Sequence, residues 1–436
     1  MIRAPHERRP AAVARGSARL AVTIASALWA LDAAGCGRGP GPDAVGIDDG
    51  RATAAPLPDP STNRRPSESE GRSDAEEHVG DLDAFDAAMR LGDAELYSGR
   101  FEEARVQYLI AMDQRVDSMA PALGALRSMN IEGQAEARAA IAERIQKKVD
   151  RLLTNDETRG SGWLLASRLA LALGDPGRAI DAAHLAVEEL PDMGVAWRVL
   201  GEAALAAEHW GEAVGALQTA ITLGLEAEAG TWERLADALD ELAELDAAED
   251  AARTALGMTG SDPHARRRRL NLLAVILKHR GNLEDALATA ERARAEGPND
   301  PAVLHNLASI AEARGKPEEA ALLYAQAVAD TPVPTTLWRY GRLLLELDRP
   351  DEALAAFKRA AANVARWSWP ASSRWLPAYE VGKLYARAEH CQEAIGWFDD
   401  ALREARTAEA TREVRSWLGY CRVLAQTGKP LDDPRP

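Results

Sequence analysis

The sequence predicts an all-α solenoid in which pairs of helices repeat along the chain and stack on one another. The first observation is a set of tryptophans at near-constant spacing, Trp163, Trp197 and Trp232. The second is an alanine that follows each tryptophan by sixteen residues and recurs twice further along the chain. These alanines are Ala179, Ala213, Ala248, Ala286 and Ala320. Self-similarity at a fixed period of about 34 residues is typical of a repeat architecture.

Each period contains two helical patterns. In the first helix, large, small and aliphatic residues recur at i, i+3, i+4 and i+7, as in Trp197, Leu200, Gly201 and Ala204. Glycine-containing turns separate the two helices, and a proline usually precedes the next pair. One pair cannot bury its apolar face alone, so the pairs must stack. This pattern resembles the tetratricopeptide repeat family. The resemblance implies a right-handed α-solenoid of about 8–9 helix-turn-helix repeats with a C-terminal capping helix.

Taken in order, the array should occupy residues 81–428. The segment 119–155 keeps two helical stretches but loses the pattern, so it should be a degenerate repeat with an extended second helix, or a break between two sub-arrays. Regular repeats then begin near residues 160, 194, 229, 267, 301, 334 and 375. A final helix from about Ala408 to Gln426 should cap the open end, and residues 429–436 should form a disordered tail.

The N-terminus has the features of an export signal. Five arginines lie before or just at the start of the apolar stretch Leu20 to Leu31, which is too short for a typical membrane span. The sequence Ala33-Ala34-Gly35-Cys36 follows and resembles the bacterial lipoprotein cleavage box, although alanine stands where that box usually has leucine. The resemblance implies that residues 1–35 are a signal peptide and that Cys36 is lipidated. An ordinary cleaved signal peptide and an uncleaved anchor are the alternatives.

Residues 36–80 are rich in glycine, proline and serine and show no hydrophobic periodicity, which predicts a disordered tether. The lipoprotein resemblance then implies an exported, membrane-anchored protein of the cell envelope. Glycine rather than aspartate follows Cys36, which favours the outer membrane, facing the periplasm. The formal net charge of −16 argues against nucleic acid as a partner.

No motif for catalysis, metal binding or cofactor binding is present in the sequence. The eight histidines form no zinc motif, and there is no glycine-rich phosphate loop and no Gly-x-Ser-x-Gly elbow. We therefore expect no catalytic residue, no metal, no cofactor and no enzymatic activity. An enzyme would need a site in the loop insert around Trp367 to Trp375 or in the irregular segment 119–155.

The later repeats carry a candidate binding groove. In the tetratricopeptide family, first-helix residues one turn off the packing face line the concave surface. Carried over by position, the groove residues are Arg268, Asn271, His305, Asn306, Trp338, Arg339, Arg342, Tyr379 and Lys383. The fourth repeat offers the opposite charge. The basic, amide-bearing surface resembles the carboxylate clamps of some members, although its asparagines fall at different repeat positions. That resemblance implies cations that bind a peptide carboxylate. An ordinary mixed solenoid face is the alternative.

Two cysteines follow Cys36 in the chain. Cys391 begins the second helix of the eighth repeat, and Cys421 lies in the next helix. In an exported protein this pair is a candidate disulfide. The alternative is two buried thiols that act as small hydrophobic residues.

The sequence thus favours a non-catalytic scaffold of the cell envelope that binds extended peptide segments or partner proteins in its concave groove. The alternative is a structural or assembly lipoprotein of an outer-membrane, pilus or secretion complex that uses its outer faces.

Overall fold

The computed structural model describes residues 72–97, 99–115, 118–129, 134–258, 260, 262–364, 367 and 373–427. The predicted signal peptide, the lipidation site Cys36, most of the tether and the predicted tail lie outside these residues. The elements in the described part of the chain are helices connected by short turns, so the predicted all-α class is confirmed. None of these helices combines the length and the apolar character that a membrane span requires.

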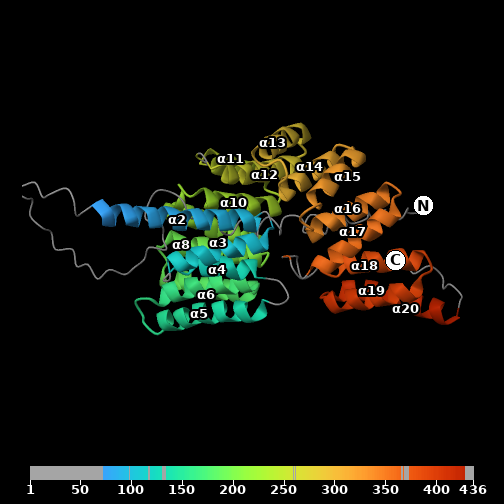
Figure 1. The fold of residues 1–436 in the computed structure, drawn as a ribbon, viewed down its shortest axis with the longest axis horizontal. Coiled ribbons are helices and arrows are strands. Elements are labelled where there is room, and N and C mark those ends of the chain that lie inside the picture. The colour runs from blue at the N-terminus through green and yellow to red at the C-terminus, as the bar shows by residue number, and fades with distance from the viewer. Residues whose placement is uncertain are drawn as a thin grey trace, which may run out of the picture. The chain divides into compact units, whose positions relative to one another are not determined.

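The described residues divide into two compact units, one ending at Leu235 and the other beginning at Ala236. The N-terminal unit is coloured from blue to green in Figure 1. It contains α2 (Arg72–Tyr97), α3 (Phe101–Gln114), α4 (Ala120–Ser128), α5 (Ala135–Leu153), α6 (Arg159–Leu173), α7 (Pro176–Glu189), α8 (Gly194–Ala206), α9 (Trp210–Ala220), the π-helical turn η3 (Ile221–Leu225) and the start of α10 (Ala229–Glu241). Helix α2 therefore begins before residue 81, and the segment 119–155 holds the short α4 followed by the long α5.

The C-terminal unit runs from yellow to red in Figure 1 and begins within α10. Its remaining helices are α11 (Leu245–Gly257), α12 (Pro263–His279), α13 (Leu283–Glu296), α14 (Pro301–Ala313), α15 (Pro317–Ala327), α16 (Pro334–Glu346), α17 (Pro350–Asn363), α18 (Leu376–Arg387), α19 (Cys391–Glu404) and α20 (Ala408–Thr427). Helix α20 packs on α19 and covers the end of the array, as the predicted capping helix should.

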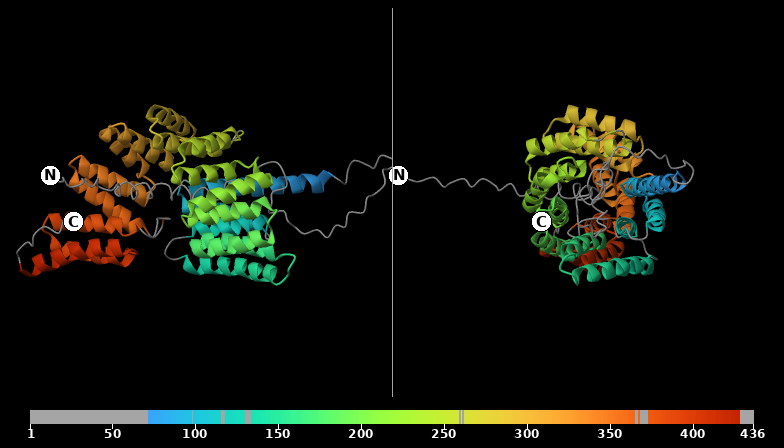
Figure 2. Two further views of the ribbon diagram at one scale, coloured as in Figure 1. Left: turned by 180° about the vertical axis from the view of Figure 1, so that it is seen from behind. Right: turned by 90° about the vertical axis from the view of Figure 1, so that its left-hand side faces the viewer.

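Within each unit, a first helix packs on the second helix of its own repeat, as in α6–α7 and α12–α13. That second helix packs on the first helix of the next repeat, as in α7–α8 and α13–α14. Figure 2 shows the consecutive helices of the N-terminal unit stacked side by side. Glycines in the first helices allow this close approach. A Cβ added at Gly201 would lie 2.6 Å from Cγ of Leu217, and one added at Gly341 would lie 2.7 Å from Cε1 of Phe357. The small residue of the sequence pattern is therefore a contact point between helices.

The periodic tryptophans also fix the loops between repeats. The indole N–H of Trp197 donates to the carbonyl oxygen of Pro191 at 2.7 Å. Trp232 donates in the same way to the carbonyl of Glu226 at 2.9 Å. Because a buried or half-buried indole usually needs a hydrogen-bond acceptor, these bonds explain why tryptophan recurs beside the inter-repeat loops.

The turn inside each repeat is tight and passes through the left-handed backbone region. Glycine occupies it at Gly281 (φ 87°) and Gly315 (φ 72°), where no side chain is strained. Other repeats place non-glycine residues there, among them Ala243 with φ 59° and Asp348 with φ 57°. These positions carry a conformational cost that the packing of the helix pair outweighs.

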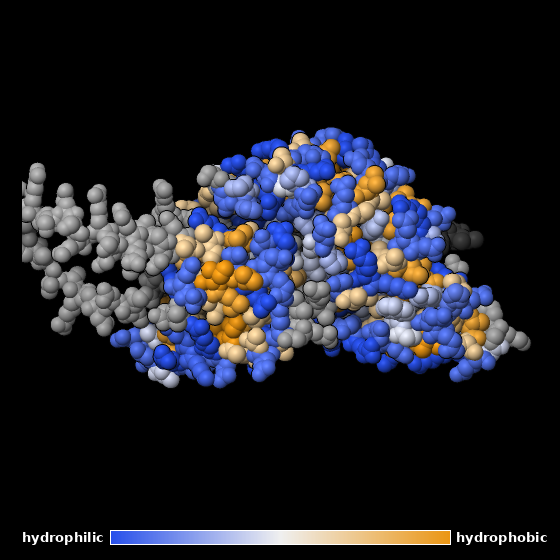
Figure 3. All heavy atoms as spheres, in the orientation of Figure 1, coloured by the Kyte–Doolittle hydropathy of each residue, from blue (hydrophilic) through white to orange (hydrophobic). Residues whose placement is uncertain are grey.

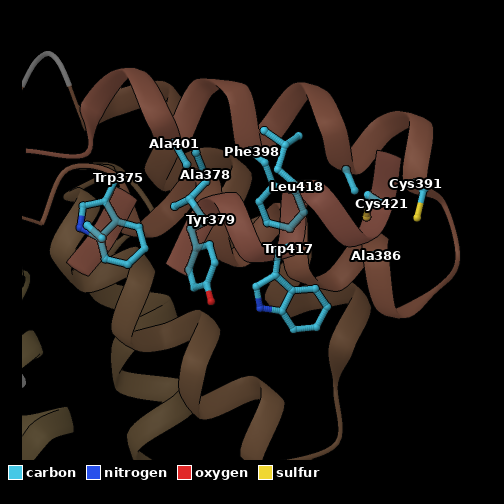
Figure 4. Packing of buried hydrophobic residues seen from close by; sticks show 13 residues of the cluster. Trp375, Ala378, Tyr379, Ala386, Cys391, Phe398, Ala401, Trp417, Leu418 and Cys421 are labelled. Atoms are coloured by element: carbon cyan, nitrogen blue, oxygen red, sulfur yellow. The ribbon is translucent and has the colours of Figure 1, made fainter. Parts of the chain in front are cut away.

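The C-terminal cap is built on aromatic side chains. Trp375 and Tyr379 of the α18 region meet Phe398 of α19 and Trp417 of α20 (Figure 4). The rings of Phe398 and Trp417 are stacked with centroids 6.4 Å apart. Burial of large rings supplies much of the apolar area that a terminal repeat has available.

Candidate interaction groove

The first helices α12, α14, α16 and α18 of the C-terminal unit carry the nine predicted groove residues. All four begin with a proline in the first turn, and an aspartate caps α12 and α14. Asp262 accepts a hydrogen bond from the backbone N–H of His264 at 2.9 Å, and Asp300 accepts from those of Ala302 and Val303. These N-caps fix where α12 and α14 begin and therefore which of their residues face the same side.

Three polar contacts connect neighbouring first helices, and we call them the inner ladder. The amide Nδ2 of Asn306 donates to Oδ1 of Asn271 at 2.9 Å, and Nζ of Lys278 donates to Oγ of Ser309 at 3.0 Å. Nδ1 of His305 and the hydroxyl of Thr336 are 2.9 Å apart. Both asparagines are buried and bond each other. These two amides of the predicted groove are therefore already engaged with each other.

His305 lies at the centre of this surface. Its ring meets the ring of Tyr324 edge-on at 5.5 Å. Burial, and then the positive charges of Arg339 and Lys278, lower the pKa of His305 well below its usual value. The imidazole is therefore neutral at pH 7, and its Nε2 has no hydrogen-bond partner among the described residues.

Tyr324 lies behind His305 and links the second helix α15 to the groove. Its hydroxyl donates to the carboxylate of Glu312 and also hydrogen-bonds Arg339. Burial, mainly, and the Glu312 carboxylate raise the pKa of Tyr324 above its ordinary range. The phenol therefore stays protonated and orients the half-buried Arg339, which was predicted to line the groove.

Arg342 is the most accessible of the predicted groove residues, and it lies over the buried ring of Trp338. The guanidinium carbon of Arg342 lies 5.2 Å from the centroid of the Trp338 ring, and Arg342 is exposed. Trp338 itself is 7% exposed, and its indole Nε1 has no hydrogen-bond partner in the described chain. A buried donor of this kind is costly unless some acceptor reaches it.

The predicted residues of α18 are engaged within the protein. The hydroxyl of Tyr379 donates to Oε1 of Glu413 on α20 at 2.6 Å, which ties the groove to the cap. Nζ of Lys383 lies 4.8 Å from the Tyr379 ring centroid and 3.1 Å from a carboxylate oxygen of Glu380. The positive charge of Lys383 is thus partly compensated by its own helix.

The adjacent first helices α14 and α16 bring together His305, Asn306, Trp338 and Arg339. Arg268 lies half-buried on α12, three residues before Asn271. The acidic fourth repeat contacts the basic surface where Nδ1 of His279 and Oδ2 of Asp240 are 2.8 Å apart.

The sequence reasoning missed a buried charged cluster in the N-terminal unit, formed by Arg198, Glu202 and Arg234. Arg198 directly follows Trp197 in the repeat pattern. An ionisable residue at this place in a first helix is the signal that could have revealed it.

The candidate cysteine pair lies outside the groove. Cys391 and Cys421 are both buried free thiols, and they neighbour each other at one end of the cap (Figure 4). Burial, together with a hydrogen bond to Cys391, raises the pKa of the Cys421 thiol to about 12. The disulfide remains a prediction about the oxidised protein.

A stack of helix pairs with a polar surface along its first helices defines a repeat solenoid of the kind that binds partners on an extended surface. Residues 164–230, 233–301 and 305–368 match the family model described as tetratricopeptide repeat. The fold is therefore a solenoid of tetratricopeptide repeats, and the matching model is that of a repeat and not of an enzyme. No curated protein matched the sequence.

The chain is similar to several solved structures. The yeast protein Tom70 is 13% identical with a TM-score of 0.55, over 81% of this chain and 84% of that one. A tetratricopeptide repeat protein from Parabacteroides merdae is 16% identical with a TM-score of 0.43, over 60% and 98%. A human IFIT1 dimer with m7Gppp-AAAA is 13% identical with a TM-score of 0.49, over 81% and 87%. At 13% identity the likeness to Tom70 concerns the fold alone.

Proposed function

We propose that the chain is a non-catalytic protein-interaction scaffold that binds an extended peptide segment along α12, α14, α16 and α18. The observation that carries this proposal is a pair of buried nitrogen atoms, Nε2 of His305 and Nε1 of Trp338, without a partner among the described residues. Arg339 and Arg342 stand beside them. A bound peptide would supply a carbonyl oxygen to the indole N–H of Trp338, a backbone carbonyl or N–H to Nε2 of His305 according to the imidazole tautomer, and carboxylates to the cations.

The groove is tested by affinity capture with Arg342→Glu/Lys383→Glu, followed by fluorescence anisotropy with a synthetic peptide from the captured partner. A charge-matched control is Lys316→Glu/Arg349→Glu, which changes two exposed cations that pair with Glu319 and Glu352 at turns before second helices. The groove variant should bind the peptide roughly tenfold or more weakly, because charged hydrogen bonds are lost. Equal binding by both variants would place the peptide on another face.

The indole nitrogen allows a finer test. Trp338→Phe keeps an aromatic ring under Arg342 but removes the donor. Peptide affinity should fall several-fold for this variant, as expected when one hydrogen bond of about 1 kcal/mol is lost. An unchanged affinity would mean that the ring alone matters.

We further propose that the protein is exported and anchored in the bacterial cell envelope through Cys36, most simply in the outer membrane facing the periplasm. The resemblance of residues 33–36 to a lipoprotein box supports this location. Labelled palmitate should be incorporated into the wild-type chain and not into Cys36→Ala. Equal labelling of both chains, or of neither, would contradict the anchor.

A second candidate function is a structural role in an envelope complex that uses the outer faces of the solenoid. Exposed apolar side chains on α2 and α3 favour it, and Figure 3 shows hydrophobic residues gathered over α3 and α4. These exposed residues are Leu91, Val106, Leu109 and Ile110. Cross-links to partners that arise only from α3, and that survive the groove variant, would favour this role over peptide binding.

A further inference from the structure

The first helix pair of the N-terminal unit, α2 and α3, is in register with the later repeats. A Cβ added at Gly92 of α2 would lie 2.8 Å from Cε1 of Tyr108 on α3, sixteen residues further along the chain. Gly201 of α8 and Leu217 of α9 meet in the same way and are also sixteen residues apart. The alanine of the repeat pattern, twelve residues after the glycine, is therefore Ala104 in α3. Residues of different repeats can be compared by their distance from this alanine.

Helix α3 exposes three large apolar side chains that are neighbours on its surface. Val106, Leu109 and Ile110 are spaced by three and four residues, and each is between 38% and 47% exposed. We call these three residues the apolar face. They belong to the hydrophobic area over α3 and α4 in Figure 3. Exposed apolar side chains that gather in this way mark interaction sites on soluble proteins.

The later repeats do not need apolar residues at these positions. The residue that corresponds to Leu109, five places after the alanine, is alanine in α15 and polar or charged in six other second helices. These residues are Ala325 in α15, then His184 in α7, Gln218 in α9, Arg253 in α11, Glu291 in α13, Lys358 in α17 and Asp399 in α19. None of these seven helices has large apolar residues at all three positions. The apolar face is therefore a property of α3 and not a requirement of the repeat.

Leu91 on the neighbouring helix α2 differs from its counterparts in burial. A leucine stands thirteen residues before the alanine in four later repeats, and each of these leucines is at most 4% exposed. They are Leu200, Leu235, Leu273 and Leu307. Leu91 takes the same position and is 43% exposed. No regular repeat precedes α2 in the described part of the chain, so this end of the array has apolar surface that a further helix could cover.

An acidic residue stands at each end of the apolar face. Glu103, Val106, Ile110 and Asp113 are spaced by three or four residues and so follow one side of α3. Glu103 and Asp113 are exposed, and neither forms an ion pair among the residues that the structure describes. They lie about 15 Å apart along the helix axis. The surface is thus an apolar stripe with a free carboxylate at both ends.

These charges discriminate between possible occupants. Two copies of α3 packed face to face would place acid opposite acid at both ends, whether the helices ran parallel or antiparallel. The same carboxylates would be repelled by a membrane of anionic lipids. An occupant with a cation at each end would instead form an ion pair with Glu103 and another with Asp113.

The secondary structure of α3 favours a helix as the occupant. The backbone N–H and C=O groups in the middle of α3 are used within the helix, so they cannot pair with an extended chain. A partner helix satisfies its own backbone and can pack its side chains between Val106, Leu109 and Ile110. Helix on helix is also how the rest of the array buries its apolar surface.

We propose that α3 is a docking surface for an amphipathic helix of a protein partner, with an apolar stripe of about two turns and a lysine or arginine at each end. This inference rests on the second candidate function given above, because it names the chemistry of a partner bound on an outer face. It is separate from the peptide groove, whose residues belong to the C-terminal unit.

The test uses two labelled helical peptides of about twenty residues, built on alanine with a leucine stripe. One carries two lysines at each end, and the other carries glutamates there. In fluorescence anisotropy, the full chain should bind the lysine-ended peptide more tightly. Val106→Ser/Ile110→Ser should bind it roughly tenfold or more weakly, because two apolar side chains no longer contribute. The matched control is Leu185→Ser/Leu322→Ser, which changes exposed leucines at the same two repeat positions in α7 and α15 and should bind as wild type does.

The carboxylates have a test of their own. Glu103→Gln/Asp113→Asn should bind the lysine-ended peptide several-fold more weakly and should lose most of the preference over the glutamate-ended peptide. The groove variant Arg342→Glu/Lys383→Glu should bind as wild type does, since it leaves α3 unchanged. Circular dichroism should be that of wild type for all variants at α3, because the altered side chains are exposed.

Several results would overturn the proposal. They are no binding of either peptide by wild type, equal binding of the two peptides, or an equal loss in the leucine control. A dimer that Val106→Ser/Ile110→Ser dissociates in sedimentation velocity would assign the surface to a second copy of the chain. Cross-links to a partner that arise from α3 while both peptides fail to bind would reject a helix with basic ends but would retain the structural role on an outer face.

Discussion

The same substitution, glycine to alanine, should have opposite effects at two helical positions of the C-terminal unit. At Gly341 in α16, an added Cβ would lie 2.7 Å from Cε1 of Phe357 and 2.9 Å from its Cδ1 and Cζ. Ordinary carbon contacts need about 3.5 Å or more. Phe357 is fully buried and has no room to retreat. At Gly396 in α19, the added Cβ would meet nothing within 4 Å.

The magnitudes follow from two opposing effects. Alanine is favoured over glycine in a helix by about 0.5–1 kcal/mol, and this gain applies at both positions. Overpacking against the fixed ring of Phe357 costs about 1–3 kcal/mol and applies only at Gly341. We therefore expect Gly396→Ala to stabilise the protein by about 0.5–1 kcal/mol. Gly341→Ala should destabilise it by about 1 kcal/mol.

Urea denaturation followed by circular dichroism measures the change in midpoint at constant m-value. Because the chain holds two units, hydrogen exchange of amides in α17 and α19 reports where the change acts. Gly382 and Gly419 form a second pair, since a Cβ at Gly382 would lie 2.6 Å from Phe398 and one at Gly419 would meet nothing. If Gly341→Ala stabilised the protein as much as Gly396→Ala, the close approach of α16 and α17 would be refuted.

Three further outcomes are expected. Ala243→Gly removes the steric strain of an alanine in the left-handed backbone region and should raise the free energy of unfolding by about 0.5–1 kcal/mol in urea denaturation. A lower free energy of unfolding for this variant would show that the turn is unstrained. Asp300→Ala should lower the free energy of unfolding by about 3–5 kcal/mol, because it removes an N-cap and the ion-pair partner of the buried Arg267, whose Nε lies 2.9 Å from Asp300. Asp262→Ala removes only an exposed N-cap and should cost about 1 kcal/mol. Equal costs for the two variants would contradict the buried ion pair. The pKa of His305 is lower in the folded than in the unfolded protein, so the unfolded chain binds more protons at low pH. The free energy of unfolding should therefore fall as pH drops below about 6.5. Urea titrations at several pH values should show a weaker pH dependence for His305→Gln than for wild type.

The period of the sequence was enough to predict the helix pairs, because each tryptophan and each small residue has a local role. Trp197 bonds the loop before its own helix, and Gly201 meets Leu217 of the same repeat. Contacts that lie within one repeat require the same residue types at the same positions of each repeat, so they are visible in the sequence as a fixed period. The capping helix α20 could be placed for the same reason, since its apolar face follows a single helical pattern.

Contacts between repeats were less predictable. The pairing of Asn271 with Asn306 depends on the distance between two first helices, which no local pattern encodes. The same holds for Arg127, which is held near Glu202 although two repeats separate them in the sequence. Sequence reasoning placed the groove residues on the correct helices but could not show which of them had already found partners inside the protein.

The inner ladder has a mechanical consequence. Stretching a solenoid separates its successive repeats. The inner ladder joins successive repeats through hydrogen bonds such as those of Asn306 and Lys278. Hydrogen bonds and apolar contacts both weaken within about 1 Å of added separation, so joined repeats resist a small displacement. The C-terminal unit should therefore resist small stretching forces and then open one repeat contact at a time. A bound chain would meet repeats at a nearly constant spacing.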